Sequence, residues 1–571
     1  MADQAMAPPE KRGLVNRMLD TVEKIGNKVP TPVMMFLYLI IGIIILSAVL
    51  DWAGVQVTED IIVAQPDLVE QTGLQGGTSG PMLVPVEFDD VSGYLPADPE
   101  YQDDYSVETV TVPIRSLLTV EGIRFIFTSF VSNFAGFSVV AVIFVSMIGI
   151  GIAEHAGLMD ALIRKLVGVA PGGILTFVII LVGGLSSVAT DAGYLILIPL
   201  AAAAFLSVNR HPLLGLAAAY AGVSAAFSVN ILIAPLDALL TEMTNEAIAI
   251  ADPSQSITIT ANWYFSVAST ILMALIMTVI AEKVTAKQLG DYDRAEMAPT
   301  DAEGDADPAI AEKPPLDPAA ESRGMRWALF ALIGGIIVIA LMTAPNGAPL
   351  RDPINGDIIG NTPFMDSLIF IITLLFLAMG LGFGYGAGTF KSSDDAIAGV
   401  TKAFAGLAGL IFMLLMISQF IALFNWSGMP NVIAGKLAQW LETAGFSEIP
   451  LLIGFILVIC LLDIIMPGSL PKWAIFAPIF VPLFMQLGVA PQTVLAAYRI
   501  GDSPMNVITP LMVYLPFILL IAQKYVKNPG IGTIISLMIP YTLVLLIAWV
   551  IFFVVWYVIG IPLGPGYSVG T

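Results

Sequence analysis

The chain has 571 residues, of which 57% are hydrophobic and only 12% are charged, and its mean hydropathy is +0.86. A water-soluble protein of this length could not bury so much apolar surface, so a soluble globular protein is excluded. The formal net charge of −21 argues against nucleic acid as a partner, because a phosphate backbone attracts basic surfaces.

The acidic residues are concentrated in two segments outside the apolar runs. Residues 55–114 carry no Lys or Arg, and residues 288–325 are rich in Pro, Ala, Asp and Glu. We interpret both as solvated surface, the first as an extracellular or periplasmic loop and the second as a cytoplasmic linker. Residues 1–30 lack the cleavage pattern of a signal peptide, so we expect them to form a cytoplasmic N-terminal segment.

Apolar runs of about 20 residues recur from residue 31 onward, each long enough to cross a hydrocarbon core about 30 Å thick. Two apolar segments, 174–207 and 450–488, are split near the middle by small, polar or Pro residues, which predicts re-entrant helical hairpins. The expected fold is therefore an all-α polytopic membrane protein with two hairpins and nine transmembrane helices. The nine predicted spans are 32–53, 137–155, 212–236, 262–282, 326–344, 365–387, 402–424, 493–521 and 531–558.

The distribution of Lys and Arg gives the orientation, because basic residues accumulate in short cytoplasmic loops. With the N-terminus inside and both hairpins returning to their own side, 18 of the 24 basic residues fall in the cytoplasm. Counting either hairpin as a single crossing would invert everything after it and spoil this bias. The first hairpin is thus expected to open to the cytoplasm and the second to the exterior, with the C-terminus outside.

Each hairpin is followed by a span that is interrupted in the same way. SSVATDAGYLILIP (186–199) precedes AGVSAAFSVNILIAP (221–235), and PGSLPKWAIFAPIFVP (467–482) precedes YRIGDSPMNVITP (498–510). Because the two hairpins enter from opposite faces, this pattern predicts an inverted-topology repeat with discontinuous helices. The two halves are residues 31–287, with the broken span 212–236, and residues 326–571, with the broken span 493–521.

Broken helices free backbone carbonyls and helix ends, which can bind a desolvated cation or carboxylate inside the membrane. Ser, Thr and Asn add neutral oxygens of the kind that sodium prefers. The alternative is that such small residues only permit close helix packing. The predicted cation-binding residues are Ser187, Thr190, Gly222, Ser224 and Asn230 in the first half and Ser469, Gly501, Ser503, Asn506 and Thr509 in the second.

Charges inside the membrane are costly unless they are paired or functional. Asp191 lies at the first hairpin tip without a nearby partner in the sequence, which favours a role in proton or substrate handling. Arg499 and Asp502 are one turn apart, spaced to pair on one helix face, and a purely structural ion pair is the alternative. Asp463 and Lys472 flank the second tip and are expected to be solvated there.

Trp473, Cys460 and two aspartates limit which classes of function are possible. Trp473 offers a face on which an aromatic solute can stack, although a packing role is the alternative. The single cysteine, Cys460, excludes an intrachain disulfide and a Cys-based metal site. An intramembrane aspartyl protease built on Asp191 and Asp502 is disfavoured, because its carboxylates must share a proton whereas Arg499 would hold Asp502 ionised.

Four motifs resemble the p-aminobenzoyl-glutamate transporter (AbgT) family: NFAGFSVVAVIFVSMIGIGIAEHAGL (133–158), SSVATDAGYLILIPLAA, AGVSAAFSVN and YRIGDSPMNVITP. The resemblance covers about residues 115–550 apart from the acidic linker. It implies a homodimer in the bacterial inner membrane that moves p-aminobenzoyl-glutamate or sulfonamide antimetabolites, without a cofactor and driven by sodium or protons. A sodium-coupled dicarboxylate carrier of a related fold is the alternative.

The resemblance also implies which residues surround the substrate. The sequence departs from the family pattern at the tip PGSLPKW, where Asp463 and Leu470 stand at positions expected to be uncharged and polar, or Ser. This departure bears on the identity of the substrate more than on the fold. The residues matched by motif are Asp191, Trp473, Pro491, Arg499, Asp502 and Pro510.

Overall fold

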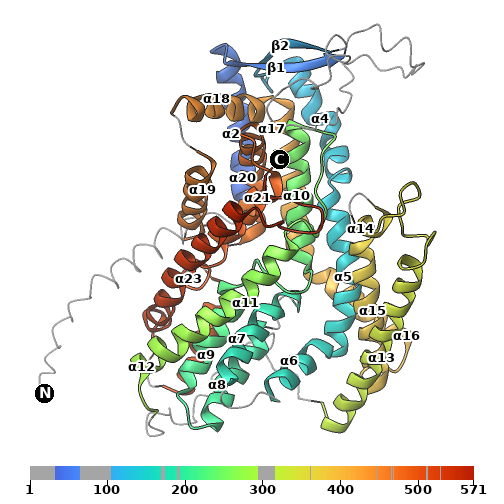
Figure 1. Cartoon of the computed structure of the whole chain (residues 1–571), viewed down its shortest axis with the longest axis vertical. Coiled ribbons are helices and arrows are strands. Elements are labelled where there is room, and N and C mark those ends of the chain that lie inside the picture. Colours follow the sequence, from blue (N-terminus) through green and yellow to red (C-terminus); the bar gives the residue numbers. More distant parts are fainter. Residues whose placement is uncertain are drawn as a thin grey trace, which may run out of the picture.

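The structure is a computed structural model in which the described part of the chain is predominantly helical (Figure 1). The described residues are 32–64, 105–168, 174–189, 193–292, 316–359, 362–444, 447–464, 466, 468–509, 512–526 and 529–570.

The described part of the first half contains helices and two strands. They are α2 (Pro32–Trp52), β1 (Gln56–Ala64), β2 (Tyr105–Pro113), α4 (Val120–Ala135), α5 (Ser138–Ala156), α6 (Leu158–Gly168), α7 (Leu175–Leu185), η1 (Ser186–Ala189), η2 (Gly193–Leu197), α8 (Ile198–Ser207), α9 (Pro212–Tyr220), η3 (Ala221–Ala225), α10 (Pro235–Ala251), α11 (Trp263–Ile280), η4 (Ala281–Thr285) and α12 (Ala286–Leu289).

The named elements in the described part of the second half are all helices. Its elements are α13 (Pro318–Thr343), α14 (Pro363–Asp366), α15 (Leu368–Ala387), α16 (Ser393–Gly406), α17 (Ala408–Trp426), α18 (Met429–Ala444), α19 (Glu448–Asp463), α20 (Ser469–Gln486), α21 (Pro491–Asp502), α22 (Leu515–Gln523) and α23 (Ile531–Ile559).

Seven helices in the described part of the chain are long and apolar enough to cross a membrane. Each overlaps one of the nine predicted spans. The two predicted spans without an unbroken helix are 212–236 and 493–521, the two that the sequence predicts to be interrupted. The polytopic helical fold is therefore confirmed.

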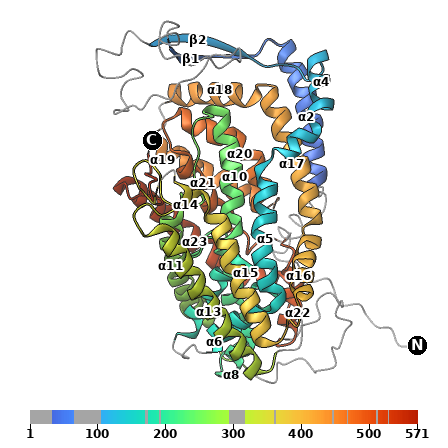
Figure 2. The ribbon, with the colours of Figure 1, turned by 90° about the vertical axis from the view of Figure 1, so that its right-hand side faces the viewer.

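A two-stranded sheet is an addition to the predicted all-helical fold. Strands β1 and β2 pair antiparallel, from Gln56 opposite Pro113 to Ala64 opposite Tyr105. They are the two ends of the acidic segment 55–114 and lie at one end of the molecule, beside α18 (Figures 1 and 2). The alternating Val and Thr residues of YSVETVTVP favour this extended pairing.

A bundle of α5, α13 and α15 forms a scaffold along one side of the molecule (Figure 2). These helices are apolar on most faces, and polar atoms inside the bundle are bonded to backbone. Thr373 of α15, for example, donates a hydrogen bond to the carbonyl of Val145 of α5 at 3.3 Å. Helices α2, α4 and α17 pack together as a second group.

Two helical hairpins lie toward opposite ends of the molecule. Helices α7 and α8 form the first, in the lower half of Figure 1, and α19 and α20 form the second, in the upper half. Each is followed by a short helix and an unwound stretch: α9 and η3 in the first repeat, α21 in the second. After the first unwound stretch the chain turns helical again as α10, which reaches Ala251, beyond the predicted end of that span at 236.

Candidate functional site

The two interruptions, which we call break 1 (residues 221–234, beginning with the π-helix η3) and break 2 (the described residues 503–509 and 512–514), have corresponding neighbours. Helices α9 and α21 both start with Pro at the first helical position, Pro212 and Pro491, and a glycine follows ten residues later in each. A Cβ on Gly222 would lie 2.6 Å from the carbonyl oxygen of Ile180 on α7, and one on Gly501 would lie 2.8 Å from that of Ile456 on α19. Each glycine thus lets its helix approach the first arm of its own hairpin.

Side chains eight residues beyond these glycines tie each break to the adjacent hairpin. Asn230 donates to the hydroxyl of Ser187 at 2.8 Å and to the carbonyl of Gly184 at 3.1 Å. Thr509 donates to the carbonyl of Ile464 at 3.2 Å. These three predicted cation ligands therefore have protein partners, and they fasten the hairpin tips in this conformation.

Ser228 joins break 1 to break 2. Its hydroxyl donates to Asp502 Oδ2 at 2.8 Å and its backbone N–H donates to the hydroxyl of Ser503 at 3.0 Å. Its carbonyl accepts from Arg499 Nη1 at 2.6 Å. Sequence reasoning missed Ser228, because its partners are about 270 positions away.

Arg499 forms its ion pair with Asp237 rather than with Asp502. Arg499 Nη1 lies 2.6 Å from Asp237 Oδ1, and Asp237 Oδ2 accepts the N–H of Ala234 at 2.7 Å. The carboxylate therefore caps the start of α10, where helix-dipole attraction favours a negative group, and orients the guanidinium at the same time. The predicted pairing of Arg499 with Asp502 is wrong, because a tertiary partner replaces the one that helical spacing suggested.

Asp463 and Lys472 are also placed differently from the prediction. Both are fully buried rather than solvated, and Lys472 forms ion pairs with Asp463 Oδ1 and with Asp502 Oδ1, the latter at 2.7 Å. Asp463 ends α19 and Lys472 lies in the first turn of α20, so folding of the hairpin tip brings them together. The sequence feature that could have predicted this ion pair is the position of Asp463 and Lys472 on either side of the predicted tip.

Asp502 is surrounded by donors. Ser469 donates to its Oδ2 at 2.5 Å, in addition to Ser228 and Lys472. Ser469 is itself held by Tyr498, whose hydroxyl donates to the carbonyl of Ser469 at 2.5 Å. The second hairpin tip, break 1 and α21 thus meet at one carboxylate.

Trp473 is fully buried beside this cluster. Its indole N–H donates to Thr244 Oγ1 of α10 at 3.0 Å, and its ring centroid lies 4.4 Å from that of Tyr498. In this conformation the buried indole therefore packs against a protein aromatic ring.

The other predicted site residues are not all near this cluster. Pro491 begins α21 and lies about 16 Å from Asp502 along the helix, at 1.5 Å per residue. The backbone carbonyl of Asn506 accepts from Tyr220 at 3.4 Å, and the hydroxyl of Ser224 is buried without a hydrogen bond. Thr190, Asp191 and Pro510 lie outside the described residues.

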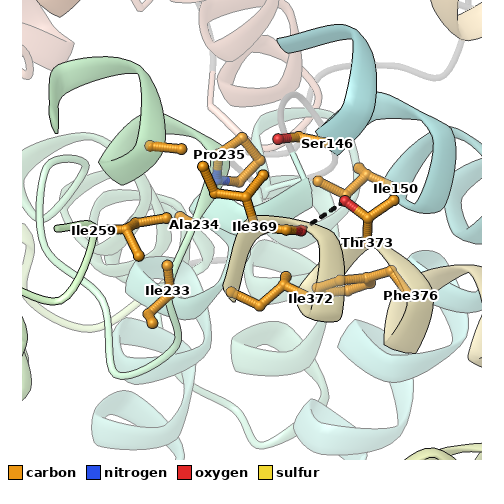
Figure 3. A pocket seen from close by; sticks show the side chains of 11 residues that line it. Ser146, Ile150, Ile233, Ala234, Pro235, Ile259, Ile369, Ile372, Thr373 and Phe376 are labelled. Atoms are coloured by element: carbon orange, nitrogen blue, oxygen red, sulfur yellow. Dashed lines mark hydrogen bonds between the residues drawn. The ribbon is translucent and has the colours of Figure 1, made fainter. Parts of the chain in front are cut away.

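Two cavities lie away from the charged cluster. One of about 20 Å³, room for about one water, lies between α5, α15 and the start of α10 and is lined mainly by apolar side chains (Figure 3). The other, of about 540 Å³, lies between the base of the second hairpin and Tyr557 of α23. Neither is lined by Arg499 or Trp473, which are 2% and 0% exposed, so the cluster is occluded.

The fold and the site together define the class of protein. Long apolar helices, two hairpins and two broken helices that meet at buried charges are the architecture of a multi-pass membrane transporter. The model of the AbgT putative transporter family matches residues 17–570. The chain belongs to this family.

Similar proteins agree with this assignment. The p-aminobenzoyl-glutamate transport protein of Escherichia coli (strain K12) is 31% identical over 547 residues, 95% of each chain. The crystal structure of the Alcanivorax borkumensis YdaH transporter, described as having an unusual topology, is 33% identical with a TM-score of 0.78, and covers 94% of this chain and 100% of its own. That of Neisseria gonorrhoeae MtrF, described as illuminating a class of antimetabolite efflux pumps, is 35% identical with a TM-score of 0.79, at 96% and 100% coverage.

These relatives are membrane transporters and not enzymes, so the protease interpretation is rejected. The geometry agrees, because Asp502 is paired with Lys472 and hydrogen-bonded by two serines. It is therefore not arranged to share a proton with a second catalytic carboxylate.

Proposed function

We propose that the protein carries small aromatic solutes that bear a carboxylate, such as p-aminobenzoyl-glutamate, together with related antimetabolites of the sulfonamide type. The observation that carries this proposal is the guanidinium of Arg499. It is buried where the two breaks meet, and its Nε makes no hydrogen bond. The names of the E. coli relative and of the Neisseria structure support the same chemistry.

The chemistry of Arg499 suits a solute carboxylate. Asp237 and the carbonyl of Ser228 both bind Nη1, which fixes the plane of the guanidinium and leaves the Nε donor uncommitted. A buried donor without a partner is unfavourable by about 1–3 kcal/mol. A carboxylate offers two oxygens matched to the planar fork, so its arrival would remove that penalty.

The occluded cluster requires a conformational change for transport. Arg499 is only 2% exposed, so a solute reaches it when a hairpin tip moves away from its break. The bonds from Asn230 to Ser187 and from Thr509 to Ile464 are those that must open. We infer alternating access in which one tip opens while the other stays closed.

We propose a homodimer in the bacterial inner membrane, with the N-terminus cytoplasmic and the C-terminus periplasmic, driven by a sodium or proton gradient. We assign the buried hydroxyl of Ser224, beside Tyr220, as one oxygen ligand of a sodium ion in the first repeat. Ser187, Asn230 and Thr509 would have to exchange a protein partner for the ion.

Counterflow in liposomes tests this function. The purified protein is placed in vesicles loaded with unlabelled p-aminobenzoyl-glutamate, and uptake of labelled solute is measured with a sodium gradient, a proton gradient or neither. We expect uptake above protein-free vesicles, enhanced by one gradient and abolished by Arg499→Ala. Arg351→Ala is the matched control, because Arg351 lies away from the cluster and donates to the backbone carbonyls of Thr343, Ala344 and Gly356.

Two results would contradict the proposal. One is uptake no greater than in empty vesicles under any gradient. The other is inhibition by an aliphatic dicarboxylate that is stronger than inhibition by unlabelled p-aminobenzoyl-glutamate, which would favour the sodium-coupled dicarboxylate carrier.

A further inference from the structure

The ionised groups buried around Lys472 do not balance. Lys472 faces two carboxylates, Asp463 and Asp502, and all three side chains are 0% exposed. Arg499 and Asp237 form a separate pair that is balanced. With every group ionised, the three-residue cluster therefore carries one uncompensated negative charge. A buried charge of this kind is strongly unfavourable, and such a group commonly takes up a proton instead.

Hydrogen bonding identifies the carboxylate that takes up the proton. Asp502 receives donors on both oxygens, from Lys472 on Oδ1 and from Ser228 and Ser469 on Oδ2, and such donors favour its ionised form. Asp463 has Lys472 on Oδ1, whereas its Oδ2 is buried and without a hydrogen-bond partner. The free lone pairs of the cluster are therefore on Asp463 Oδ2.

We propose that Asp463 is a proton-binding site of the transporter. In the occluded state its carboxylate binds one proton at Oδ2, which leaves Lys472 and Asp502 as a neutral ion pair. A proton fits better than a sodium ion, because sodium needs several oxygen ligands and the Lys472 ammonium already occupies the other oxygen of Asp463. The titratable groups of this cluster are Lys472 of α20, which contacts Asp463 directly, and Asp502 of α21, which contacts Lys472. Tyr498 and Arg499 lie on the same helix as Asp502, and they contact Asp502 and Asp237, respectively. Cys460 lies one turn before Asp463 on α19.

The proton site at Asp463 gives a physical reason why binding of a proton and binding of the solute are coupled. This coupling rests on the proposed function. A solute carboxylate at Arg499 adds a negative charge to the same buried region. Protonation of Asp463 removes one negative charge. The proton and the solute carboxylate should therefore each favour binding of the other. A sulfonamide without a carboxylate should show much weaker coupling.

An infrared pH titration of the purified protein tests the proton site without any solute. On acidification, the carbonyl stretch of a protonated carboxylic acid should grow, and Asp463→Asn should remove one component of it. The variant should fold, since it leaves the Lys472 and Asp502 pair balanced. Asp394→Asn, which changes an exposed carboxylate of α16, is the control, and Asp191→Asn tests the other candidate carboxylate. An unchanged band in Asp463→Asn, or loss of that component in Asp191→Asn alone, would overturn the proposal.

Binding of p-aminobenzoyl-glutamate as a function of pH tests the coupling. One coupled proton lets the affinity rise by at most about tenfold per pH unit on acidification. We expect a slope approaching that value in the wild type above the pH at which the infrared titration shows Asp463 to be protonated without solute, and a flat profile in Asp463→Asn. The same slope in both proteins, or a loss of sodium dependence with the pH slope retained, would contradict the coupling. If the wild type binds no p-aminobenzoyl-glutamate at any pH, the proposed function fails, whereas the infrared result still decides whether Asp463 binds the proton.

Discussion

At the scale of single residues, two buried cations each find their carboxylates on other elements. Arg499 of α21 meets Asp237 of α10, and Lys472 of α20 meets Asp463 of α19 and Asp502 of α21. Burial of a charge is tolerated only when the partner and the remaining hydrogen bonds are supplied. These pairs therefore fix the relative positions of four helices around the occluded cluster.

Asp237→Asn should destabilise the protein, because it leaves the buried guanidinium without its counter-charge. Breaking a buried ion pair typically costs about 3–5 kcal/mol, and the 14% exposure of the Asp237 side chain places the expected loss near the lower value. The thermal midpoint of the detergent-solubilised protein measures it. Asp366→Asn is the control, since Asp366 is an exposed carboxylate in the first turn of α14. A midpoint equal to that of the wild type would show that Asp237 is dispensable.

The sequence allowed the charged residues to be found but not their partners. Arg499, Asp502 and Trp473 were predicted because charges and a Trp beside a helix break stand out in an apolar chain. Their partners Asp237, Ser228 and Thr244 come from the first half of the chain, and spacing within one helix carries no information about them. Asp463 was predicted to be solvated because it flanks the second hairpin tip in the sequence, whereas in the structure it is buried beside Lys472, which also contacts Asp502 of α21.

At the scale of elements, the two repeats share the same structural arrangement. A proline starts the helix, a glycine lets it approach its hairpin, and a polar side chain beyond the glycine bonds the hairpin near its tip. The charges are not repeated, because the position after Gly501 is Asp502 whereas the position after Gly222 is Val223. The second repeat therefore supplies most of the charged groups, and the first supplies Asp237 and the hydroxyl and backbone of Ser228.

Gly222→Ala should test the close approach of break 1 to the first hairpin. The added methyl group would lie 2.6 Å from the backbone oxygen of Ile180, and relief of such overpacking typically costs about 1–3 kcal/mol. Gly334→Ala is the matched control, because nothing lies within 4 Å of the new methyl group and alanine favours a helix interior by about 0.5–1 kcal/mol. The thermal midpoint should fall in the first variant and hold or rise in the second. Equal midpoints would mean that the repeat does not depend on this contact.

Sequence patterns predicted the interruptions of both spans but not the extent of the first. The first broken span was predicted to end at residue 236, whereas Pro235 occupies the first helical position of α10, where its missing N–H costs nothing. The β1 and β2 ribbon was missed because the acidic content of residues 55–114 masked the alternating Val and Thr at its ends. The fold class did not depend on either boundary.

At the scale of the whole molecule, the two breaks share one hydrogen-bonded crossing. Movement of the second hairpin tip disturbs Asp502, which is bonded to Ser228 of break 1. Movement of the first tip acts on the same break through Asn230. Both hairpin tips are thus linked to break 1, the second through Asp502. This shared attachment gives a physical reason why one hairpin opens while the other stays closed.

The inverted orientation of the repeats can be tested by labelling. In a protein with Cys460 replaced by Ala, single cysteines at Ser568 and at Ala302, a position outside the described residues, should react with an impermeant reagent from opposite faces of the membrane. Ser568 is exposed in the C-terminal tail, and the basic residues favour a cytoplasmic position for Ala302. Labelling of both cysteines from the same face would contradict the predicted topology.

The most direct test of the transport account is the affinity of Arg499→Lys for two ligands. Lysine keeps the charge but loses the planar fork, so binding of p-aminobenzoyl-glutamate should weaken by about 1–3 kcal/mol, the usual strength of a charge-assisted hydrogen bond. A sulfonamide without a carboxylate should lose much less. Calorimetric titration of both ligands on the wild type and the variant gives the comparison. A larger loss for the carboxylated ligand is the predicted result, and equal losses, or none for either ligand, would show that Arg499 does not bind the solute carboxylate.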